Sequence, residues 1–358
     1  MRIRTGLFLF SVLLLTACSS LGPSSIARDR FDYISSISDS WKRQMLLNLL
    51  KVRYTDAPVF MDVASVINSY EMTGEVNLRG QLADKIYGSV QGDQILSLGA
   101  TGRYVDRPTI SYQPLSGDKF ARSLMMPVPV SSILFLIQSG YPADLVMRVC
   151  INSVNGLDNA YGGSGNPRAG EPKFHELISA IRRAQRAGGM GMRLKTVKDR
   201  QPVVMFLKNS IDESVAEPNN KIKSLLGLDQ KAAEFTVVYG DFPDSNTEIS
   251  ILSRSILQVM IDIASYIDVP AKDLAEGRVN DHTLTPEQRQ LFPPLIAIKT
   301  GTAKPDDAFI AVQYRNQWFW IEDRDVASKQ MLTFLMMMFS LTETSSTQSA
   351  PILTVPTR

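Results

Sequence analysis

Cysteine and histidine are scarce in this chain of 358 residues. It contains only two cysteines, Cys18 and Cys150, and two histidines, His175 and His282. The histidines are far apart in the sequence and lack the short spacing that zinc ligands show, so no zinc site is expected. Two cysteines also cannot supply the network of disulfides that stabilises small secreted domains.

An excess of charge is absent as well. The 38 Lys and Arg residues nearly balance the 36 Asp and Glu residues, which gives a formal net charge of +2. Proteins that bind nucleic acids usually carry a strongly basic domain or face. We therefore expect no nucleic-acid partner, and we find no internal repeat that would indicate a solenoid.

The chain also lacks a long hydrophobic run near its start. The apolar stretch Leu7 to Leu15 is interrupted only by Ser11 and is shorter than the about 20 residues that a transmembrane helix requires. Arg2 and Arg4 precede it, and Leu15-Thr16-Ala17-Cys18 ends it. A basic start, a short apolar core and an exit of small residues are the parts of a secretory signal peptide.

The segment Leu15-Thr16-Ala17-Cys18 resembles the lipobox of bacterial lipoproteins, in which a leucine and two small residues precede a cysteine. The resemblance implies that Cys18 becomes the first mature residue and carries lipid on its sulfur and its amine. Two or more acyl chains anchor a protein stably. Ser19 follows the cysteine, which resembles the signal for sorting to the outer membrane. The alternative is an ordinary buried cysteine behind an uncleaved signal.

With Cys18 lipidated, Cys150 has no partner for an intramolecular disulfide. It lies in an apolar helical pattern, where a cysteine is expected to be a small core residue. The mature chain is long enough for more than one domain. We expect these regions: signal peptide, 1–17; lipidated cysteine and flexible tether, 18–27; N-terminal helix plus strand-rich region, 28–130; helical middle region, 131–230; C-terminal α+β region, 231–345; tail, 346–358.

Hydrophobic periodicity predicts an α+β fold with mixed, mainly antiparallel sheets and several packed helices. Helices are expected at 39–53, within 131–157 as a pair separated at Gly140 and Pro142, and at 171–189, 253–267 and 327–343. Strands are expected at 58–67, 191–197, 202–208, 234–240, 247–253 and 295–300. Residues 308–323 predict a hairpin that turns at Arg315-Asn316.

Residues 73–115 predict several further antiparallel strands. Leu96, Leu98, Ala100, Gly102 and Tyr104 fall on one face of a strand, and Ser97, Gly99, Thr101 and Arg103 fall on the other. We favour an ordinary sheet with one solvated face. The alternative is a hairpin donated to an oligomeric outer-membrane barrel, whose strands show the same weak alternation.

Lys299-Thr300-Gly301 at the end of a predicted strand resembles the Lys-Thr-Gly motif of penicillin-recognising serine enzymes. Those enzymes also carry Ser-x-x-Lys and Ser-x-Asn motifs, in that order. The matching segments here are Ser116-Gly117-Asp118-Lys119, Ser153-Val154-Asn155 and Ser164-Gly165-Asn166. The resemblance implies that Ser116 attacks an acyl carbonyl, Lys119 takes its proton, Ser164 relays it, and Lys299 with Thr300 binds the substrate carboxylate.

The surroundings of these motifs differ from the enzyme pattern. The segment after Ser116 is charged, and Pro127 ends it within a few turns, whereas the enzymes have a long buried helix there. Ser164 lies in a glycine-rich loop. We therefore keep the acyl-transfer enzyme as the alternative function and predict no catalytic residue.

Two other clusters could bind partners. Basic residues crowd one helix and the following strand, where we favour a solvated face over an anionic lipid site: Arg182, Arg183, Arg186, Arg193, Lys195, Lys198 and Arg200. In the hairpin, alternation places Trp318 and Trp320 on one face and Phe319 and Ile321 on the other, and we favour core packing over a partner surface.

These observations predict a non-enzymatic lipoprotein that is a structural or assembly component of a cell-envelope complex. It would be held at the outer membrane through lipid on Cys18, with its body in the periplasm. The expected partners are the membrane, other envelope proteins or further copies of the chain. No cofactor and no metal are expected.

Overall fold

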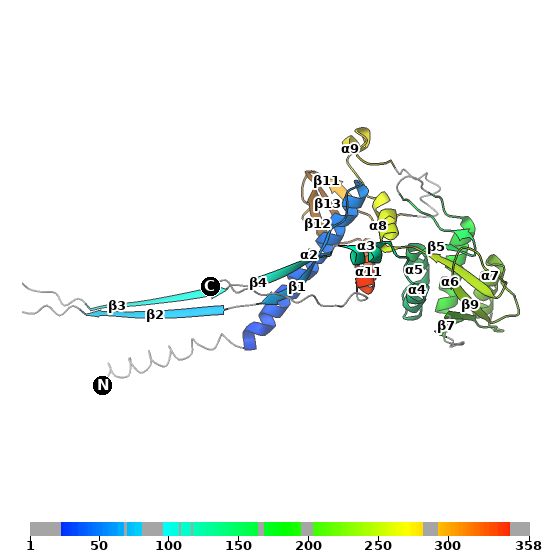
Figure 1. Cartoon of the computed structure of the whole chain (residues 1–358), viewed down its shortest axis with the longest axis horizontal. Helices are drawn as coiled ribbons and strands as arrows, with labels where there is room; N and C mark the ends of the chain where they lie inside the picture. Colours follow the sequence, from blue (N-terminus) through cyan, green and yellow to red (C-terminus); the bar gives the residue numbers. More distant parts are fainter. Residues whose placement is uncertain are drawn as a thin grey trace, which may run out of the picture. The chain divides into compact units, whose positions relative to one another are not determined.

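The computed structural model describes residues 23–67, 70–80, 96–106, 109–115, 117–163, 168–194, 203–281 and 293–343. The chain divides into two compact units (Figure 1). The first, which we call the body, comprises Met1–Val59 and Ser116–Arg358; the second, which we call the ribbon, is Phe60–Leu115. Helices and mostly antiparallel sheets together confirm the predicted α+β class. The lipobox and Ser19 lie outside the described residues.

The ribbon consists of strands that pair two at a time. Strand β1 (Phe60–Ile67) is antiparallel to β4 (Thr109–Leu115), and β2 (Tyr70–Gly80) is antiparallel to β3 (Leu96–Asp106). Each pair is a two-stranded sheet, and no further strand of the described chain joins either one. The predicted alternation of residues 96–104 therefore lies on a strand, as expected.

The body contains a six-stranded sheet in the order β6-β5-β10-β9-β8-β7. Its strands are β5 (Ile151–Val154), β6 (Leu157–Asp158), β7 (Met190–Leu194), β8 (Val203–Leu207), β9 (Glu234–Tyr239) and β10 (Glu248–Ser253). Strands β9 and β10 are parallel, and all other neighbours are antiparallel. Most of the predicted strands of the central chain thus meet in one sheet.

Helices α4 (Val130–Gln138), α5 (Ala143–Cys150), α6 (Pro172–Arg186) and α7 (Glu213–Leu225) cover one face of this sheet (Figure 1). Leu134 of α4, Ile181 of α6 and Ile222 of α7 line a narrow internal space together with Met205 and Ile251 of the sheet. This apolar layer is the main core of the sheet region, and burial of such side chains is the dominant stabilising contribution.

A second sheet has three antiparallel strands in the order β11-β13-β12: β11 (Lys299–Gly301), β12 (Ala308–Tyr314) and β13 (Gln317–Glu322). Arg315 and Asn316 join β12 to β13 with φ values of 48° and 64°. Two consecutive positive φ angles fit the tight turn that follows the twist of a hairpin. The predicted hairpin is confirmed, turn included.

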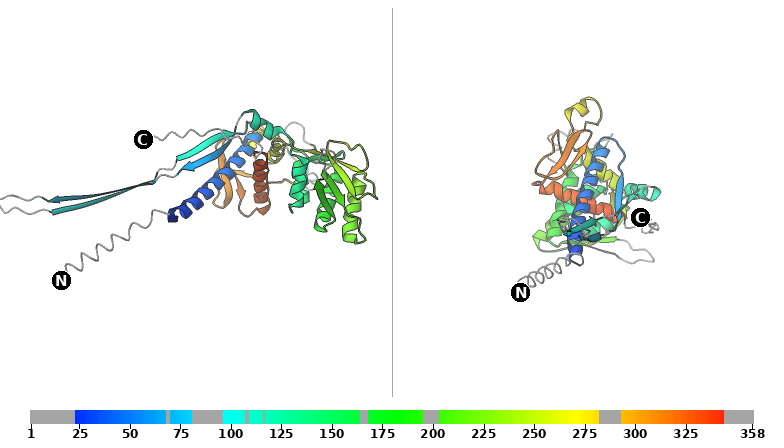
Figure 2. Two further views of the ribbon diagram at one scale, coloured as in Figure 1. Left: turned by 60° about the horizontal axis from the view of Figure 1, so that its bottom comes forward. Right: turned by 90° about the vertical axis from the view of Figure 1, so that its left-hand side faces the viewer.

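Helix α2 (Pro23–Arg53) packs against this second sheet and against α8 (Ile256–Ser265). From residue 29 on, where burial is described, its buried residues lie in its last third: Met45, Leu46, Asn48, Leu49, Leu50 and Arg53. Figure 2 shows α11 (Val326–Glu343) beside it. The two remaining helices are short: α3 (Asp118–Met125) and α9 (Ala271–Ala275). Helix α2 confirms the helix predicted at 39–53 and also extends back to Pro23, into the expected tether.

Three local expectations differ from the structure. The second helix of the pair within 131–157 ends at Cys150, because the chain continues as β5 into a turn at Asn155-Gly156, where both φ angles are positive. Helix α7 was not predicted; Pro218 lies inside it, and the Asp212 side chain caps its start by accepting a hydrogen bond from Ser214 N. Of the strand expected at 295–300, only Lys299 and Thr300 pair as a strand, and β11 continues one residue further to Gly301.

The expected boundary at residue 230 runs through the six-stranded sheet. Strands β5 to β8 precede that residue, while β9 and β10 follow it and complete the centre of the sheet. The expected helical middle region thus contributes four strands as well as helices. Pairings such as β10 with β5 join segments about a hundred residues apart, and local patterns do not specify them.

Candidate functional site

The Lys-Thr-Gly segment is strand β11 at the edge of the three-stranded sheet. The Nζ atom of Lys299 lies 2.6 Å from Oε1 of Glu322, and both side chains are about half exposed. Thr300 is partly buried, and its hydroxyl has no hydrogen-bond partner among the described residues. Gly301 is paired with Trp318. The carboxylate of Glu322 on the neighbouring strand β13 therefore balances the positive charge of Lys299, and no bound anion is required to do so.

One predicted Ser-x-Asn segment lies in the other sheet of the body. The hydroxyl of Ser153 on β5 donates a hydrogen bond to Asp241 Oδ1 at 2.7 Å. The side-chain amide of Asn155 donates to Leu226 O at 2.9 Å, and its oxygen accepts from Ser250 N at 2.7 Å. Both side chains hold the β5–β6 turn against its neighbours. They belong to a different sheet from Lys299.

The described structure does not place the remaining residues of the acyl-transfer motifs beside Lys299 or Ser153. Ser116 and the segment 164–166 lie outside the described residues. Lys119 is in the first turn of α3, and its side chain is not described. Helix α3 ends at Met125, as expected from Pro127, and is too short to be the long buried helix of the enzymes.

Three arginines of the basic cluster on α6 and β7 pair with carboxylates of other elements. The guanidinium of Arg182 lies 3.5 Å from Asp144 of α5. Arg183 pairs with Glu217 of α7, and Arg193 pairs with Glu234 of β9. Lys195, Lys198 and Arg200 lie outside the described residues. Because these pairs are exposed, each contributes about 0–1 kcal/mol to stability.

The aromatic hairpin strand has one core face and one outer face. Phe319 and Ile321 are fully buried, and the ring of Phe319 lies 6.5 Å from that of Tyr54. Trp318 and Trp320 share the opposite face and are partly exposed, with Lys304 Nζ 5.9 Å from the Trp318 ring centroid. The predicted division of the strand into two faces is confirmed. Core packing, the favoured interpretation of this strand, holds for Phe319 and Ile321, whereas Trp318 and Trp320 are partly exposed.

A buried polar cluster in the body was missed by sequence reasoning. Arg254, at the end of β10, and Asp262, on α8, form an ion pair at 3.0 Å with side chains 1% and 6% exposed. Arg254 also donates to the carbonyl oxygen of Ala160, and its guanidinium lies 5.3 Å from the ring of Tyr161. Nothing in the spacing of Arg254 and Asp262 marks them as a pair before the fold is known.

The same cluster fastens the loop that follows β6. The backbone N–H of Gly162 donates to Asp262 Oδ1 at 2.5 Å. A Cβ atom at Gly162 would lie 2.0 Å from Ser265 Oγ, so only glycine fits there. Burial raises the pKa of nearby Tyr266 to about 12, with the Asp262 charge acting in the same direction. These contacts join a loop, a strand end and a helix, so we assign the cluster a structural role.

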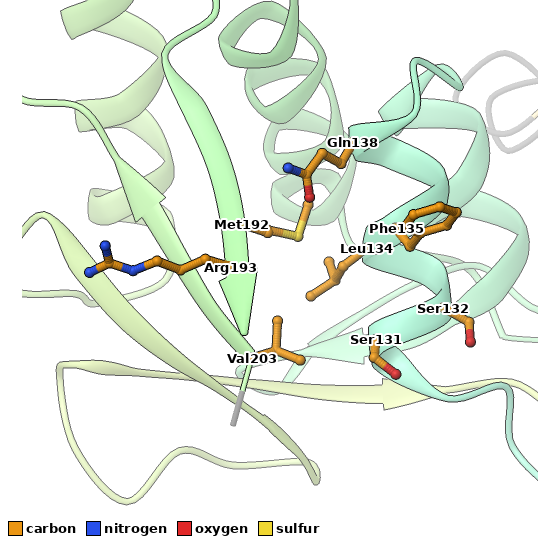
Figure 3. A pocket seen from close by; sticks show the side chains of 8 residues that line it. All are labelled: Ser131, Ser132, Leu134, Phe135, Gln138, Met192, Arg193 and Val203. Atoms are coloured by element: carbon orange, nitrogen blue, oxygen red, sulfur yellow. The ribbon is translucent and has the colours of Figure 1, made fainter. Parts of the chain in front are cut away.

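A groove of about 350 Å³ lies between α4 and the edge of the six-stranded sheet. Figure 3 shows the side chains that line it. It is lined by Ser131, Ser132, Leu134, Phe135 and Gln138 from α4, Met192 and Arg193 from β7, and Val203 from β8. Phe135 is 69% exposed, which is unusual for a phenylalanine beside apolar neighbours. The groove has room and apolar lining for an apolar side chain.

The ribbon provides an extended candidate interaction surface. In β2 and β3 the register pairs Met72 with Tyr104, Val76 with Ala100, and Leu78 with Leu98. Directly opposed residues share a face of an antiparallel pair. Most apolar positions of both strands therefore fall on one face, whereas Val105, opposite Glu71, falls on the other. In β4, Ile110 and Tyr112 are two positions apart and are 41% and 57% exposed.

Comparison of the chain with known protein families, curated proteins and solved structures gives no match. Within the described ranges, no helix is both long and apolar enough to cross a membrane. The same residues contain no group of three or more His, Cys, Asp or Glu side chains arranged to hold a metal ion. His282 lies outside the described residues.

Proposed function

We propose that this chain is a non-enzymatic assembly component of a bacterial cell envelope, and that copies of it associate through the ribbon. In this proposal Cys18 carries the lipid anchor, the outer membrane holds that lipid, and the body lies in the periplasm. The pairing of β2 with β3 as an isolated two-stranded sheet is the observation that carries the proposal.

Such a ribbon is an incomplete structure in water. Strands β2 and β3 are each 11 residues long, yet they pair only with one another among the described strands. A two-stranded sheet is marginally stable unless further strands or a packed face support it. No described strand pairs with its two outer edges, and unpaired N–H and C=O groups along such edges readily pair with another chain. Association with another chain would give the ribbon both a packed face and hydrogen-bond partners for its outer edges.

A second copy of the chain is the occupant that best fits these edges. Identical ribbons have the same length and the same apolar positions, so strand pairing between copies keeps the apolar face continuous. If the rotation between neighbours closes into a ring, every outer edge is paired. Lipid on Cys18 would keep all copies on one membrane surface and raise their local concentration.

The test is the mass of the purified protein by light scattering, in detergent with its anchor and again without lipid. We expect a defined oligomer in detergent. Leu98→Asp, at a position opposite Leu78, should reduce the mass to that of a monomer because it places a charge on the apolar face. Ser97→Asp is the matched control, since Ser97 is opposite Arg79 on the other face.

A strictly monomeric protein in both states would contradict the proposal. Equal effects of Leu98→Asp and Ser97→Asp would contradict the assignment of the apolar face. Circular dichroism of both variants should match that of the unchanged protein, because the body, which contains all the described helices and the six-stranded sheet, is not altered.

A further inference from the structure

Strands β2 and β3 separate charged from apolar positions along their whole length. Their register puts the odd-numbered positions of both strands on one face and the even-numbered positions on the other. The odd-numbered face, which we call the charged face, carries Glu71, Glu75, Arg79 and Arg103. The even-numbered face, which we call the apolar face, has Asp106 as its only charged residue, at the last position of β3.

The apolar face is small and aliphatic in its middle and aromatic at one end. The three central pairs of opposed residues are Gly74 with Gly102, Val76 with Ala100, and Leu78 with Leu98.

Tyr70 and Tyr104, the two aromatic residues of this face, occupy neighbouring pairs at its end. Interfaces between proteins usually concentrate aromatic residues near their centre. Strands that contact lipid have the opposite arrangement, with an apolar middle and aromatic residues where the bilayer meets water. The apolar face follows the second pattern.

The length of the two strands also matches a bilayer. Strands β2 and β3 have 11 residues each, and every residue of one is opposite a residue of the other, without a bulge. A tilted strand needs about 9–11 residues to cross the hydrocarbon of a bilayer. Most strands of water-soluble domains are shorter, with about 5–6 residues.

The pair formed by β1 and β4 has an apolar face as well, and here the exposure of the side chains is described. Tyr112 is opposite Val63, and Ile110 is opposite Val66. A bulge between Val63 and Ser65 adds one residue to β1, which keeps Val66 on the same face as Val63. Ile110 and Tyr112 are 41% and 57% exposed. A contiguous exposed apolar patch of this kind marks an interaction surface.

We propose that the apolar face of β2 and β3 lies against the acyl chains of a lipid bilayer and that the charged face is in contact with water. The inference rests on the proposed function, because backbone groups at a strand edge cannot stay unpaired in hydrocarbon and ribbons of neighbouring copies would pair them. It adds the identity of what covers the apolar face of the associated ribbons, which is lipid.

The test uses the full chain with its anchor, reconstituted into phosphatidylcholine vesicles and carrying one nitroxide spin label on an introduced cysteine. Val76→Cys and Leu98→Cys place the label on the apolar face. Asn77→Cys and Ser97→Cys, each one position away, are the matched controls on the charged face. Electron paramagnetic resonance measures collisions of the label with oxygen, which dissolves in hydrocarbon, and with a nickel chelate, which stays in water.

We expect the ratio of oxygen collisions to nickel collisions to be at least about fivefold higher at positions 76 and 98 than at positions 77 and 97. Met72→Cys, opposite Tyr104 at the end of the apolar face, should give an intermediate ratio, because that end would lie where the bilayer meets water.

The native cysteines should not take up the label. Cys150 is fully buried, and Cys18 carries lipid in the proposed function. The unchanged chain, treated in the same way, checks this.

A second measurement needs no substitution, so it does not depend on the folding of any variant. The unchanged protein is reconstituted with a phosphatidylcholine that carries a photoreactive diazirine in the middle of its acyl chain. After illumination, mass spectrometry locates the lipid adducts. We expect adducts within residues 70–80 and 96–106. Adducts confined to other parts of the chain would overturn the proposal.

Equal collision ratios on the two faces of an oligomer would overturn the inference and leave the proposed function standing. Labels at positions 76 and 98 that are shielded from both oxygen and nickel would show that protein covers the apolar face, and would overturn the inference too. Light scattering of the same samples identifies a failure of the proposed function, since a monomer would contradict both proposals.

Discussion

The guanidinium of Arg254 lies 3.0 Å from the carboxylate of Asp262, and both side chains are almost completely shielded from water. This pair connects the end of β10 to α8 and, through Gly162, to the loop after β6. Removing one member of a buried ion pair leaves a buried charge without compensation. The body therefore depends on both groups being present.

Replacing Asp262 with Asn should lower the free energy of unfolding by about 3–5 kcal/mol, because Arg254 would remain buried and charged. Denaturant titration followed by circular dichroism measures this change. Glu322→Gln is the matched control: it breaks the exposed pair with Lys299 and should cost about 1 kcal/mol or less. Similar losses in the two variants would contradict a special role for the buried pair.

Phe319 should be essential to the packing of the three-stranded sheet. Its side chain is fully buried against Tyr54, so Phe319→Ala should lower the free energy of unfolding by about 3–5 kcal/mol. Gln313→Ala, at an exposed position of the adjacent strand, should change it by about 0.5 kcal/mol or less. Thermal unfolding of both variants provides the comparison. A small effect at Phe319 would mean that the hairpin packs loosely on α2.

The stability of the body should fall in alkaline solution partly because of Cys150. Burial raises the pKa of its thiol to about 12, with the charge of Arg254 acting in the opposite direction. A thiol in an unfolded chain has a pKa of about 8.5. Since the folded pKa is the higher one, the stabilisation is complete below about pH 8.5 and is lost as the pH rises toward 12.

Cys150→Ala should remove this contribution. We expect the free energy of unfolding of the unchanged protein to fall more steeply between about pH 9 and 12 than that of the variant, by up to about 1.4 kcal/mol per pH unit. The measurement is a denaturant titration at several pH values. Parallel curves for the two proteins would show that the folded thiol ionises as readily as the unfolded one.

The anchor is tested at Cys18. Cys18→Ala should abolish labelling by a fatty-acid probe and release the protein from membranes, because it removes the sulfur that would carry the lipid. Retention of the variant on membranes after a high-salt wash would contradict the proposed tether. Ser19→Thr, which keeps the cysteine, is the control for export and folding.

The enzyme alternative is tested with a fluorescent penicillin. We expect no labelling of the purified protein, since α3 is short and Lys299 is paired with Glu322. A positive control is a known penicillin-binding protein in the same experiment. Labelling that disappears in Ser116→Ala would instead establish Ser116 as a nucleophile and replace the proposed function.

Local patterns predicted a good part of the fold. The hairpin at Arg315-Asn316 was predicted correctly because β-branched and aromatic residues flank a two-residue turn, and turn geometry is decided locally. The break between α4 and α5 was predicted for the same reason, since Gly140 and Pro142 interrupt any helix. In contrast, no helix was predicted at α7, which contains Pro218 in its interior.

Which residues come together at each candidate site depends on contacts between distant parts of the chain, and local sequence patterns do not predict those contacts. Ser153 and Lys299 matched two motifs of one enzyme family, but the fold puts them in different sheets. Arg254 and Asp262 matched no motif, yet they form the buried ion pair of the body. The sequence specifies the chemical type of each side chain, whereas long-range strand pairing and helix packing determine which side chains lie close together.

The sequence alone determined the α+β class, the alternation of the ribbon strands and the two faces of the aromatic hairpin, because all of these follow from hydrophobic periodicity. Only the tertiary structure decided which strands are neighbours and which edges stay open. It left β7 at the end of its sheet and β2 with β3 as a separate pair. A backbone N–H or C=O group at such an edge is unpaired when no other strand lies beside it, and only the folded chain determines which strands lie side by side.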